Sequence, residues 1–106
     1  MNVKDVMDLK PLKLTETDTV FNASKFMKEQ RIRNLPIVDC DNKLTGLITL
    51  REIIKILCSD KKNENILIKY AMLKEVMIVQ SNTPLLEGVE VMMSNHLGCL
   101  PVIDSK

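Results

Sequence analysis

The sequence predicts an α/β fold (α+β in its arrangement), with one complete β-α-β-β-α unit and a partial second unit. An internal repeat is the main sign of it, because a shift of 65 residues places residues 3–7 over 68–72 and residues 35–39 over 100–104 without a gap. Between these blocks, apolar residues change from helical spacing to the short continuous runs of buried strands. A repeat of this length indicates one supersecondary unit used twice. We therefore expect the function to reside where the two units meet.

The first unit begins with a short strand and a helix. Residues 13–15 form the candidate strand, and the polar residues after them are typical of a turn. Asp18 or Thr19 can cap the N-terminus of the helix, because a short oxygen-bearing side chain accepts from the free N–H groups there. The helix is expected to fade at Gln30. Its apolar face carries Val20, Ala23, Phe26 and Met27.

A hairpin follows this helix. The apolar residues 35–38 predict one buried strand, residues 44–48 predict a second, and residues 40–43 form the turn. Two such runs with a short connection indicate an antiparallel pair. Pro36 has no N–H to donate to a neighbouring strand, so we expect it near the start of its strand or at the edge of the sheet.

A second helix closes the first unit. It is expected from residue 49 to about 58, with Ile53, Ile54 and Leu57 directed inward. The expected segments of the chain are a first repeat at 1–58, a polar linker at 59–67 and a second repeat at 68–106.

The second repeat shows the same order of elements but is incomplete. A strand is expected at 78–79, then a helix after Thr83-Pro84, since proline is favoured at the first helical position. Another strand is expected at 100–103, and the sequence ends at Lys106, before a return strand and a closing helix. We therefore expect a fragment of a longer protein, with one unpaired apolar edge on the strand at 100–103.

Composition argues against several classes of function. The net charge is +1 and the basic residues are scattered, which argues against direct nucleic-acid binding. No apolar run approaches the roughly 20 residues that cross a membrane. Cys40, Cys58 and Cys99 lack CxxC spacing and His96 is the only histidine, so we expect neither a metal site nor a catalytic centre. An odd number of cysteines without a secretory signal fits a reducing cytosol, so we expect a cytoplasmic protein. We do not expect an enzyme, because no nucleophile–base pair or paired acids stand at a plausible spacing.

Four features resemble the tandem cystathionine-β-synthase (CBS) domain, whose pairs are also called Bateman modules. They are Val-Lys-Asp-Val-Met at 3–7, Leu-Pro-Ile-Val-Asp at 35–39, Gly46-Leu47-Ile48-Thr49 followed by Glu52, and the same order restarting at Ile68. The resemblance implies a regulatory module in which two units pack through their sheets about a pseudo-two-fold axis. It also implies that the clefts between the units bind adenosyl compounds such as AMP, ADP, ATP or S-adenosylmethionine, with no cofactor required.

The resemblance assigns ligand-binding roles to two residues at the start of the second helix. Thr49 matches the Thr or Ser that bonds phosphate or ribose, and Glu52 matches the acid that takes the ribose hydroxyls, where the family usually has Asp. A helix N-terminus favours an anion, and a carboxylate accepts from both hydroxyls of a ribose. The alternative is a capping box, in which the two side chains satisfy the helix's own free N–H groups.

Four further residues are candidates by the same resemblance. Arg33 and Asn34 match a place where family members reach phosphate, and Leu14 and Thr15 match the strand whose backbone contacts the adenine edge. The alternatives are a solvated loop for Arg33 and an ordinary strand for Leu14 and Thr15.

The second repeat offers no equivalent set of side chains. Gly98-Cys99 stand where the first repeat has Arg33 and Asn34. The counterparts of the threonine and the acid would lie eight and eleven residues beyond Lys106. If an adenosyl compound binds, we therefore expect only the first repeat to supply a full set of contacts.

Two functions follow from these observations. The leading one is a ligand-sensing regulatory module that passes its signal to the effector domain of a parent protein. The alternative is a structural dimerisation module with no bound nucleotide. A homodimer is expected in either case, because the family's pairs assemble face to face and an exposed apolar strand edge recruits another chain. Neither function requires nucleic acid or a membrane.

Overall fold

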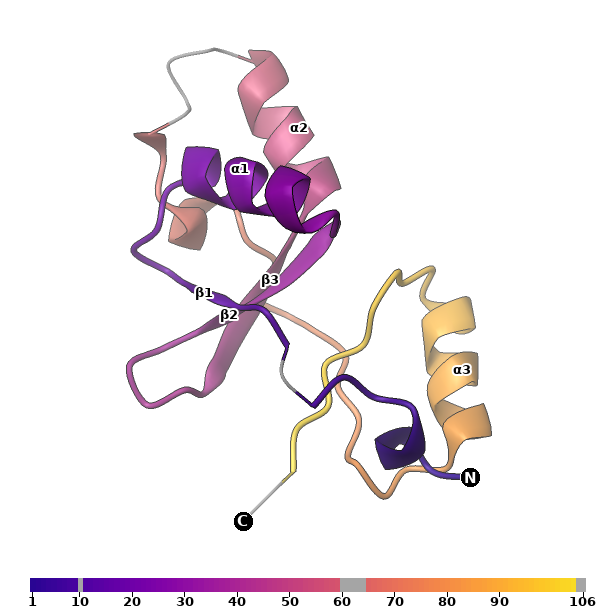
Figure 1. Cartoon of the computed structure of the whole chain (residues 1–106). Helices are drawn as coiled ribbons and strands as arrows, with labels where there is room; N and C mark the ends of the chain where they lie inside the picture. The colour runs from indigo at the N-terminus through magenta and orange to yellow at the C-terminus, as the bar shows by residue number, and fades with distance from the viewer. Residues whose placement is uncertain (10, 60–64, 105–106) are drawn as a thin grey trace. The chain divides into compact units, whose positions relative to one another are not determined.

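The computed structural model describes residues 1–9, 11–59 and 65–104, and its helices and strands follow the predicted order (Figure 1). The chain forms two compact units: unit 1 consists of Met1–Pro11 with Met77–Lys106, and unit 2 consists of Leu12–Val76. Most of the expected linker, residues 60–64, lies outside the described residues. None of the described helices is long and apolar enough to cross a membrane.

Unit 2 contains the predicted β-α-β-β-α order. Its sheet has the strand order β1-β2-β3, with β1 parallel and β3 antiparallel to β2. Helix α1 packs on β2, α2 packs on β3, and the two helices contact each other over the sheet (Figure 1). The elements are β1 (Leu14–Thr15), α1 (Val20–Gln30), β2 (Asn34–Val38), β3 (Leu44–Thr49), α2 (Leu50–Ser59) and the 3-10 helix η3 (Ile68–Tyr70). The mixed α/β fold and the hairpin are thus confirmed.

Local hydrogen bonds explain where α1 begins and ends. Thr19, one of the two candidates for the N-cap, accepts the N–H of Asn22 at 3.1 Å through its hydroxyl. At the other end Arg31 adopts the left-handed conformation (φ 56°), and the N–H of Ile32 donates to the carbonyl of Met27 at 3.0 Å. This bond closes the helix in the manner usually reserved for glycine.

Pro36 lies inside the central strand rather than at an edge. It pairs with Leu47, whose N–H and carbonyl both bond Leu73 on the far side of β3. The Pro36–Leu47 pair is therefore a non-hydrogen-bonded one, and the nitrogen of Pro36 faces the side of β1. Because β1 pairs only with Ile37 and Val38, no strand residue needs a donor at Pro36. A central strand can thus hold a proline where its neighbour is too short.

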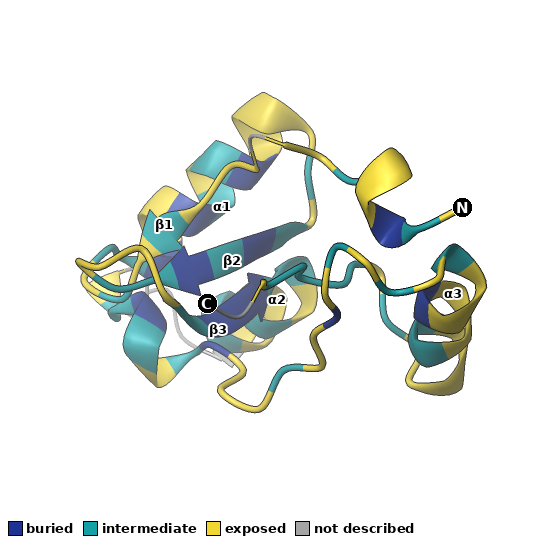
Figure 2. Cartoon of the chain, turned by 90° about the horizontal axis from the view of Figure 1, so that it is seen from below, coloured by how far each residue is buried: buried dark blue, intermediate teal, exposed yellow. Residues whose placement is uncertain are grey.

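The core of unit 2 is aliphatic, in a chain with only 3% aromatic residues. Its buried members come from both helices, the hairpin and η3, and the dark-blue segments of Figure 2 mark them. Phe26 is half-buried against this cluster. Ile54 was expected to point inward, but 51% of its surface is exposed, because the adjacent Ile53 takes the core position on α2. The core residues are Val20, Ala23, Met27, Leu35, Ile37, Ile48, Ile53, Ile68 and Met72.

Gly46 allows the start of the second repeat to approach β3. A Cβ atom at this position would lie 2.6 Å from the carbonyl oxygen of Leu73 and 2.8 Å from Sδ of Met72. Leu47 and Leu73 exchange two backbone hydrogen bonds of 2.9 and 2.8 Å beside it. A side chain at residue 46 would force this antiparallel pair apart.

Unit 1 has fewer regular elements than expected. It contains the 3-10 helix η1 (Val3–Asp5) and helix α3 (Leu85–Ser94). The strands predicted at 78–79 and 100–103 are reduced to one parallel bridge between Val79 and Val102. The register is nonetheless that of the first repeat, because Leu14 and Ile37 pair in the same way and lie 65 residues earlier.

The two repeats exchange their first segments. The N–H of Val3 donates to the carbonyl of Thr83 at 2.9 Å, and its counterpart Ile68 donates to the carbonyl of Asp18 at 2.8 Å. The first segment of each repeat therefore packs in the unit formed by the rest of the other. Units defined by packing and repeats defined by sequence consequently have different boundaries.

Candidate functional site

Thr49 and Glu52 meet at the junction of β3 and α2. The Thr49 hydroxyl donates a hydrogen bond of 2.6 Å to Oε2 of Glu52, and both residues are half-buried. Thr49 ends the strand and Glu52 lies in the first turn of the helix, where the helix dipole stabilises a negative charge. The pair can therefore present an oriented carboxylate and a hydroxyl to a ligand with neighbouring hydroxyl groups.

Asn34 and Arg33 lie beside this pair. Asn34 is the register partner of Thr49 in the β2–β3 hairpin, and the carbonyl of Arg33 accepts the N–H of Leu50 at 2.9 Å. The structure thus gathers four of the six residues that the family resemblance singled out. All four belong to unit 2.

Leu14 and Thr15 lie at the other end of β2. They pair with Ile37 and Val38, three and four residues along the strand from Asn34, or roughly 10 Å and more at the rise of a β-strand. The N–H of Thr15 donates to the Asp18 carboxylate at 3.1 Å. Leu14 packs against the core, and β2 separates both residues from β3. The structure therefore does not bring them to the side chains of Thr49 and Glu52.

The alternative role of Thr49 and Glu52 was a capping box. Such a box links each side chain to a backbone N–H group. The hydrogen bond between Thr49 and Glu52 joins the two side chains directly, with Thr49 as donor. This bond uses Oε2 of Glu52, and the carboxylate carries a second oxygen that can accept from another group.

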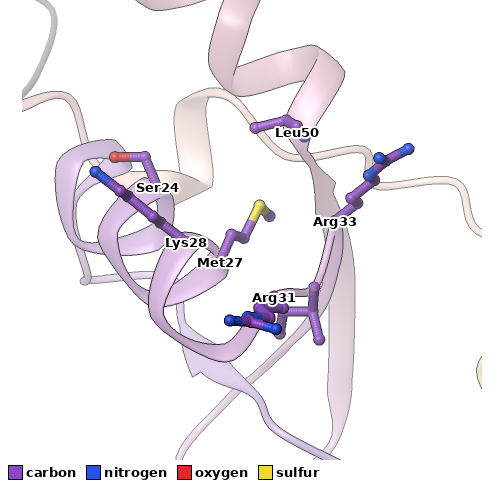
Figure 3. Close-up of a pocket in the computed structure, with 7 residues that line it drawn as sticks. Ser24, Met27, Lys28, Arg31, Arg33 and Leu50 are labelled. Atoms are coloured by element: carbon purple, nitrogen blue, oxygen red, sulfur yellow. The ribbon is translucent and has the colours of Figure 1, made fainter.

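A pocket of about 340 Å³ lies next to this junction, between the end of α1, the start of β2 and the start of α2. Figure 3 shows the Met27 thioether inside it, Lys28 and Ser24 on the α1 side, and Arg33 across from them with its guanidinium turned away from Met27. Sequence reasoning named Arg33 but missed Lys28 and Ser24, whose positions resemble a solvated helix face. The lining residues are Ser24, Met27, Lys28, Arg31, Ile32, Arg33 and Leu50.

The second repeat keeps the backbone turn beside this pocket but not the charges. His96 stands at the position of Arg31 and shares its left-handed conformation, with φ 55°. The N–H of Leu97 donates to the carbonyl of Met92 at 2.9 Å, as Ile32 does to Met27. Lys28 and Arg33 are replaced by Met93 and Gly98. The lining of the pocket by cationic side chains is therefore a feature of the first repeat alone.

The described part of the chain holds no cluster of side chains arranged for metal binding or for thiol catalysis. No group of three or more His, Cys, Asp or Glu residues there could hold a metal ion. Cys40 and Cys58 are exposed free thiols, and Cys99 is half-buried. Burial raises the pKa of the Cys99 thiol above its ordinary 9.0, so it is protonated and weakly nucleophilic at neutral pH.

Comparison with known proteins places these features in a family context. The family model for the CBS domain matches residues 3–59 and 67–106. The structure of AcuB from Vibrio cholerae, a protein named for acetoin utilization, is 30% identical, with a TM-score of 0.93 over 99% of this chain and 78% of that one. The CBS domain pair of protein MJ0100, in complex with 5′-methylthioadenosine and S-adenosyl-L-methionine, is 27% identical, with a TM-score of 0.87 over 99% and 85%.

A curated relative shows the same match within a much longer protein. Inosine-5′-monophosphate dehydrogenase of Methanocaldococcus jannaschii is 33% identical over 98% of this chain, but the match covers 19% of that enzyme. A homoserine O-acetyltransferase of Methanococcus vannielii is 28% identical over 96% of this chain and 21% of its own length. The chain thus spans about a fifth of the curated enzymes that it matches.

Proposed function

Because the chain belongs to the CBS domain family, we propose that it is a regulatory module that binds an adenosyl compound and signals to the effector domain of a longer protein. The candidate ligands are AMP, ADP, ATP and S-adenosylmethionine. The complex of the MJ0100 pair with two adenosyl compounds supports this class of ligand. The small share of the matched enzymes that this region covers supports a regulatory rather than a catalytic part.

The hydrogen bond between Thr49 and Glu52 carries the proposal. It fixes the Glu52 carboxylate at the N-terminus of α2, where it can accept from the 2′- and 3′-hydroxyls of a ribose. Thr49 can exchange its internal bond for one to the ligand. The side chains of Arg33 and Asn34, at the start of β2, supply a charge and an amide for a phosphate or carboxylate.

Leu14 and Thr15 have a smaller part in this proposal. Their expected contact is through the backbone, and they lie at the far end of β2 from Asn34. The N–H of Thr15 is already bonded to Asp18. The ribose end of the ligand therefore rests on Thr49 and Glu52, and Leu14 and Thr15 remain candidates for its adenine end.

A thermal-shift screen of the 106-residue chain tests the proposal. The screen uses AMP, ADP, ATP, S-adenosylmethionine and 5′-methylthioadenosine, with guanosine monophosphate as a control. A ligand that binds only the folded state stabilises it by about 2.7 kcal/mol at 100 times its Kd. At least one adenosyl compound should raise the melting temperature well above the control. No shift with any of them would contradict ligand sensing.

The alternative, a dimerisation module without nucleotide, is favoured by one observation. Leu86, Val89 and Met93 lie on one face of α3 and are 71%, 40% and 71% exposed. A second copy of the chain could bury this face. Light scattering measures the molecular mass in solution at protein concentrations between about 1 and 500 μM. A dimer that binds no adenosyl compound supports the alternative, and a monomer at every concentration contradicts it.

A further inference from the structure

We propose that the pocket between α1, β2 and α2 is a second binding site, which takes a small organic anion with an apolar body. The pocket lies wholly within unit 2. Thr49 and Glu52 do not line it. Arg33 lines the pocket and is also a candidate contact for the adenosyl ligand, whereas Lys28 and Arg31 belong to the pocket alone. The proposal therefore goes beyond adenosyl binding and is tested on Lys28 and Arg31.

The charge of the pocket points to an anion. Lys28, Arg31 and Arg33 line it, and no acidic side chain does. Among the described residues none of these three cations forms an ion pair or a side-chain hydrogen bond. Figure 3 shows their charged ends on three sides of Met27, and an anionic group placed among them would accept charge-assisted hydrogen bonds.

The interior of the pocket points to an apolar body on the same ligand. Met27 is 3% exposed and forms its floor together with the half-buried side chains of Ile32 and Leu50. The pocket's 340 Å³ lies at the lower end of the range for small-molecule sites, about 300–1,000 Å³. A bare inorganic ion would meet the cationic rim and leave the apolar floor unused.

Ser24 adds little to anion recognition, so the hydrogen bonds to the anionic group must come from the cationic side chains. Its hydroxyl donates to the carbonyl of Phe21 at 2.7 Å, so it faces the pocket only as an acceptor. The opposite wall carries Arg33, whose guanidinium extends away from Met27 (Figure 3). Lys28 and Arg31 are therefore the side chains we expect to contact the anionic group most closely.

The backbone at Arg31 supplies an independent sign of function. A left-handed residue after a helix is favourable for glycine or asparagine and unfavourable for arginine. The first repeat nevertheless carries Arg31 there, with φ 56° and ψ 44°. The second repeat shows that the same turn forms without a cation-lined pocket, since His96, Met93 and Gly98 occupy the equivalent positions. The fold therefore does not require these charges, whereas a ligand would.

An NMR titration of the full chain with phenyl phosphate tests the site. The probe combines a phosphate with an aromatic ring, and benzyl alcohol serves as the neutral analogue. Phenyl phosphate should shift the amide signals of Arg31, Ile32 and Leu50 in a saturable way. Benzyl alcohol and inorganic phosphate should each bind several-fold more weakly, because each offers only half of the recognised chemistry.

Two variants and one matched control locate the binding. Lys28→Met carries the residue of the second repeat, and Arg31→Asn suits the left-handed conformation, so both should fold. Each should weaken phenyl phosphate binding by about three- to tenfold, the value of one charged contact near the surface. Lys25→Ala removes an exposed lysine of the same helix that does not line the pocket, and should leave the affinity unchanged.

Three results would overturn the proposal. One is the absence of saturable shifts, and another is equal loss of affinity in Lys25→Ala and in the two pocket variants. The third is equal affinity for benzyl alcohol and phenyl phosphate, which would mean that the cations play no part. Since no adenosyl compound is used, these results are separate from the outcome for adenosyl binding.

Discussion

The Thr49 hydroxyl donates a 2.6 Å hydrogen bond to Oε2 of Glu52, across the point where β3 becomes α2. The two residues are three apart in the sequence, so the turn itself brings them together. Asn34 stands beside Thr49 on the neighbouring strand, and the Arg33 carbonyl holds the N–H of Leu50. The first repeat thus concentrates its polar chemistry at one end of one hairpin.

Thr49→Ala and Glu52→Ala should each weaken adenosyl binding about tenfold or more. Each removes a hydrogen bond involving a charged group, which is worth about 1.5–3 kcal/mol. Titration calorimetry measures the change in Kd. Thr45→Ala is the matched control, because Thr45 lies on the same strand and donates to the carbonyl of Ile37 at 3.2 Å, away from the junction. Equal effects of Thr45→Ala and Thr49→Ala would argue against a ligand role.

Gly46→Ala should destabilise the fold by about 1–3 kcal/mol, the usual cost of overpacking. The new methyl group would lie 2.6 Å from the Leu73 carbonyl, so the Leu47–Leu73 pair must move. Gly88→Ala is the milder comparison, since outside its own helix the new methyl group would lie close to one side-chain atom, Cγ2 of Val3 at 3.3 Å, and alanine favours the helix by up to about 1 kcal/mol. Urea unfolding compares the two. A Gly46→Ala protein as stable as Gly88→Ala would contradict the close approach.

Much of unit 2 was predictable because its signals are local. The helical spacing of apolar residues predicted α1, and Thr19 was one of the two candidates for its N-cap. Two apolar runs joined by a short turn predicted the hairpin. The pair Thr49 and Glu52 came from the resemblance to the CBS domain, through the run Gly46-Leu47-Ile48-Thr49 followed by Glu52. These features depend on neighbours in the sequence, so the sequence alone expresses them.

Other features depend on contacts that no local pattern expresses. The apolar residues 68–72 look alike whether they pack in one unit or the other, so the exchange of first segments could not be predicted. Ile54 was placed inward because it is as apolar as Ile53, yet the turn of about 100° per residue carries it away from the side on which Ile53 is buried. Lys28 was overlooked because an exposed lysine near a helix end is ordinary until the fold brings Arg33 opposite it.

Arg31→Gly should raise the free energy of unfolding by roughly 0.5–1 kcal/mol. Arginine bears the cost of the left-handed conformation, about 1 kcal/mol, and glycine does not. Thermal or urea unfolding measures the gain. Arg33→Gly provides the contrast, because Arg33 is not among the left-handed residues and glycine there only adds backbone entropy to the unfolded chain. A loss of stability in Arg31→Gly would contradict this account of the helix end.

The Asp104 carboxylate should titrate below its ordinary value of about 3.8. The backbone N–H and the hydroxyl of Ser81 donate to it at 2.8 and 2.9 Å and lower its pKa. Because the folded pKa is the lower one, the contact stabilises unit 1 above the unfolded value and is lost as pH falls through the folded value. NMR titration of Asp104 measures this, and Ser81→Ala should return the pKa toward the ordinary value. An unchanged midpoint in Ser81→Ala would mean that Ser81 is not the cause.

An amide chemical-shift map of the 106-residue chain with an adenosyl compound tests the central claim most directly. The ligand is the one that gives the largest thermal shift, or S-adenosylmethionine if none does. Adenosyl binding by the first repeat predicts saturable shifts at Arg33, Asn34, Thr49 and Glu52, and their loss in Glu52→Ala. Saturable shifts confined to other residues, or none at millimolar ligand, would contradict the claim and leave dimerisation as the function of this module.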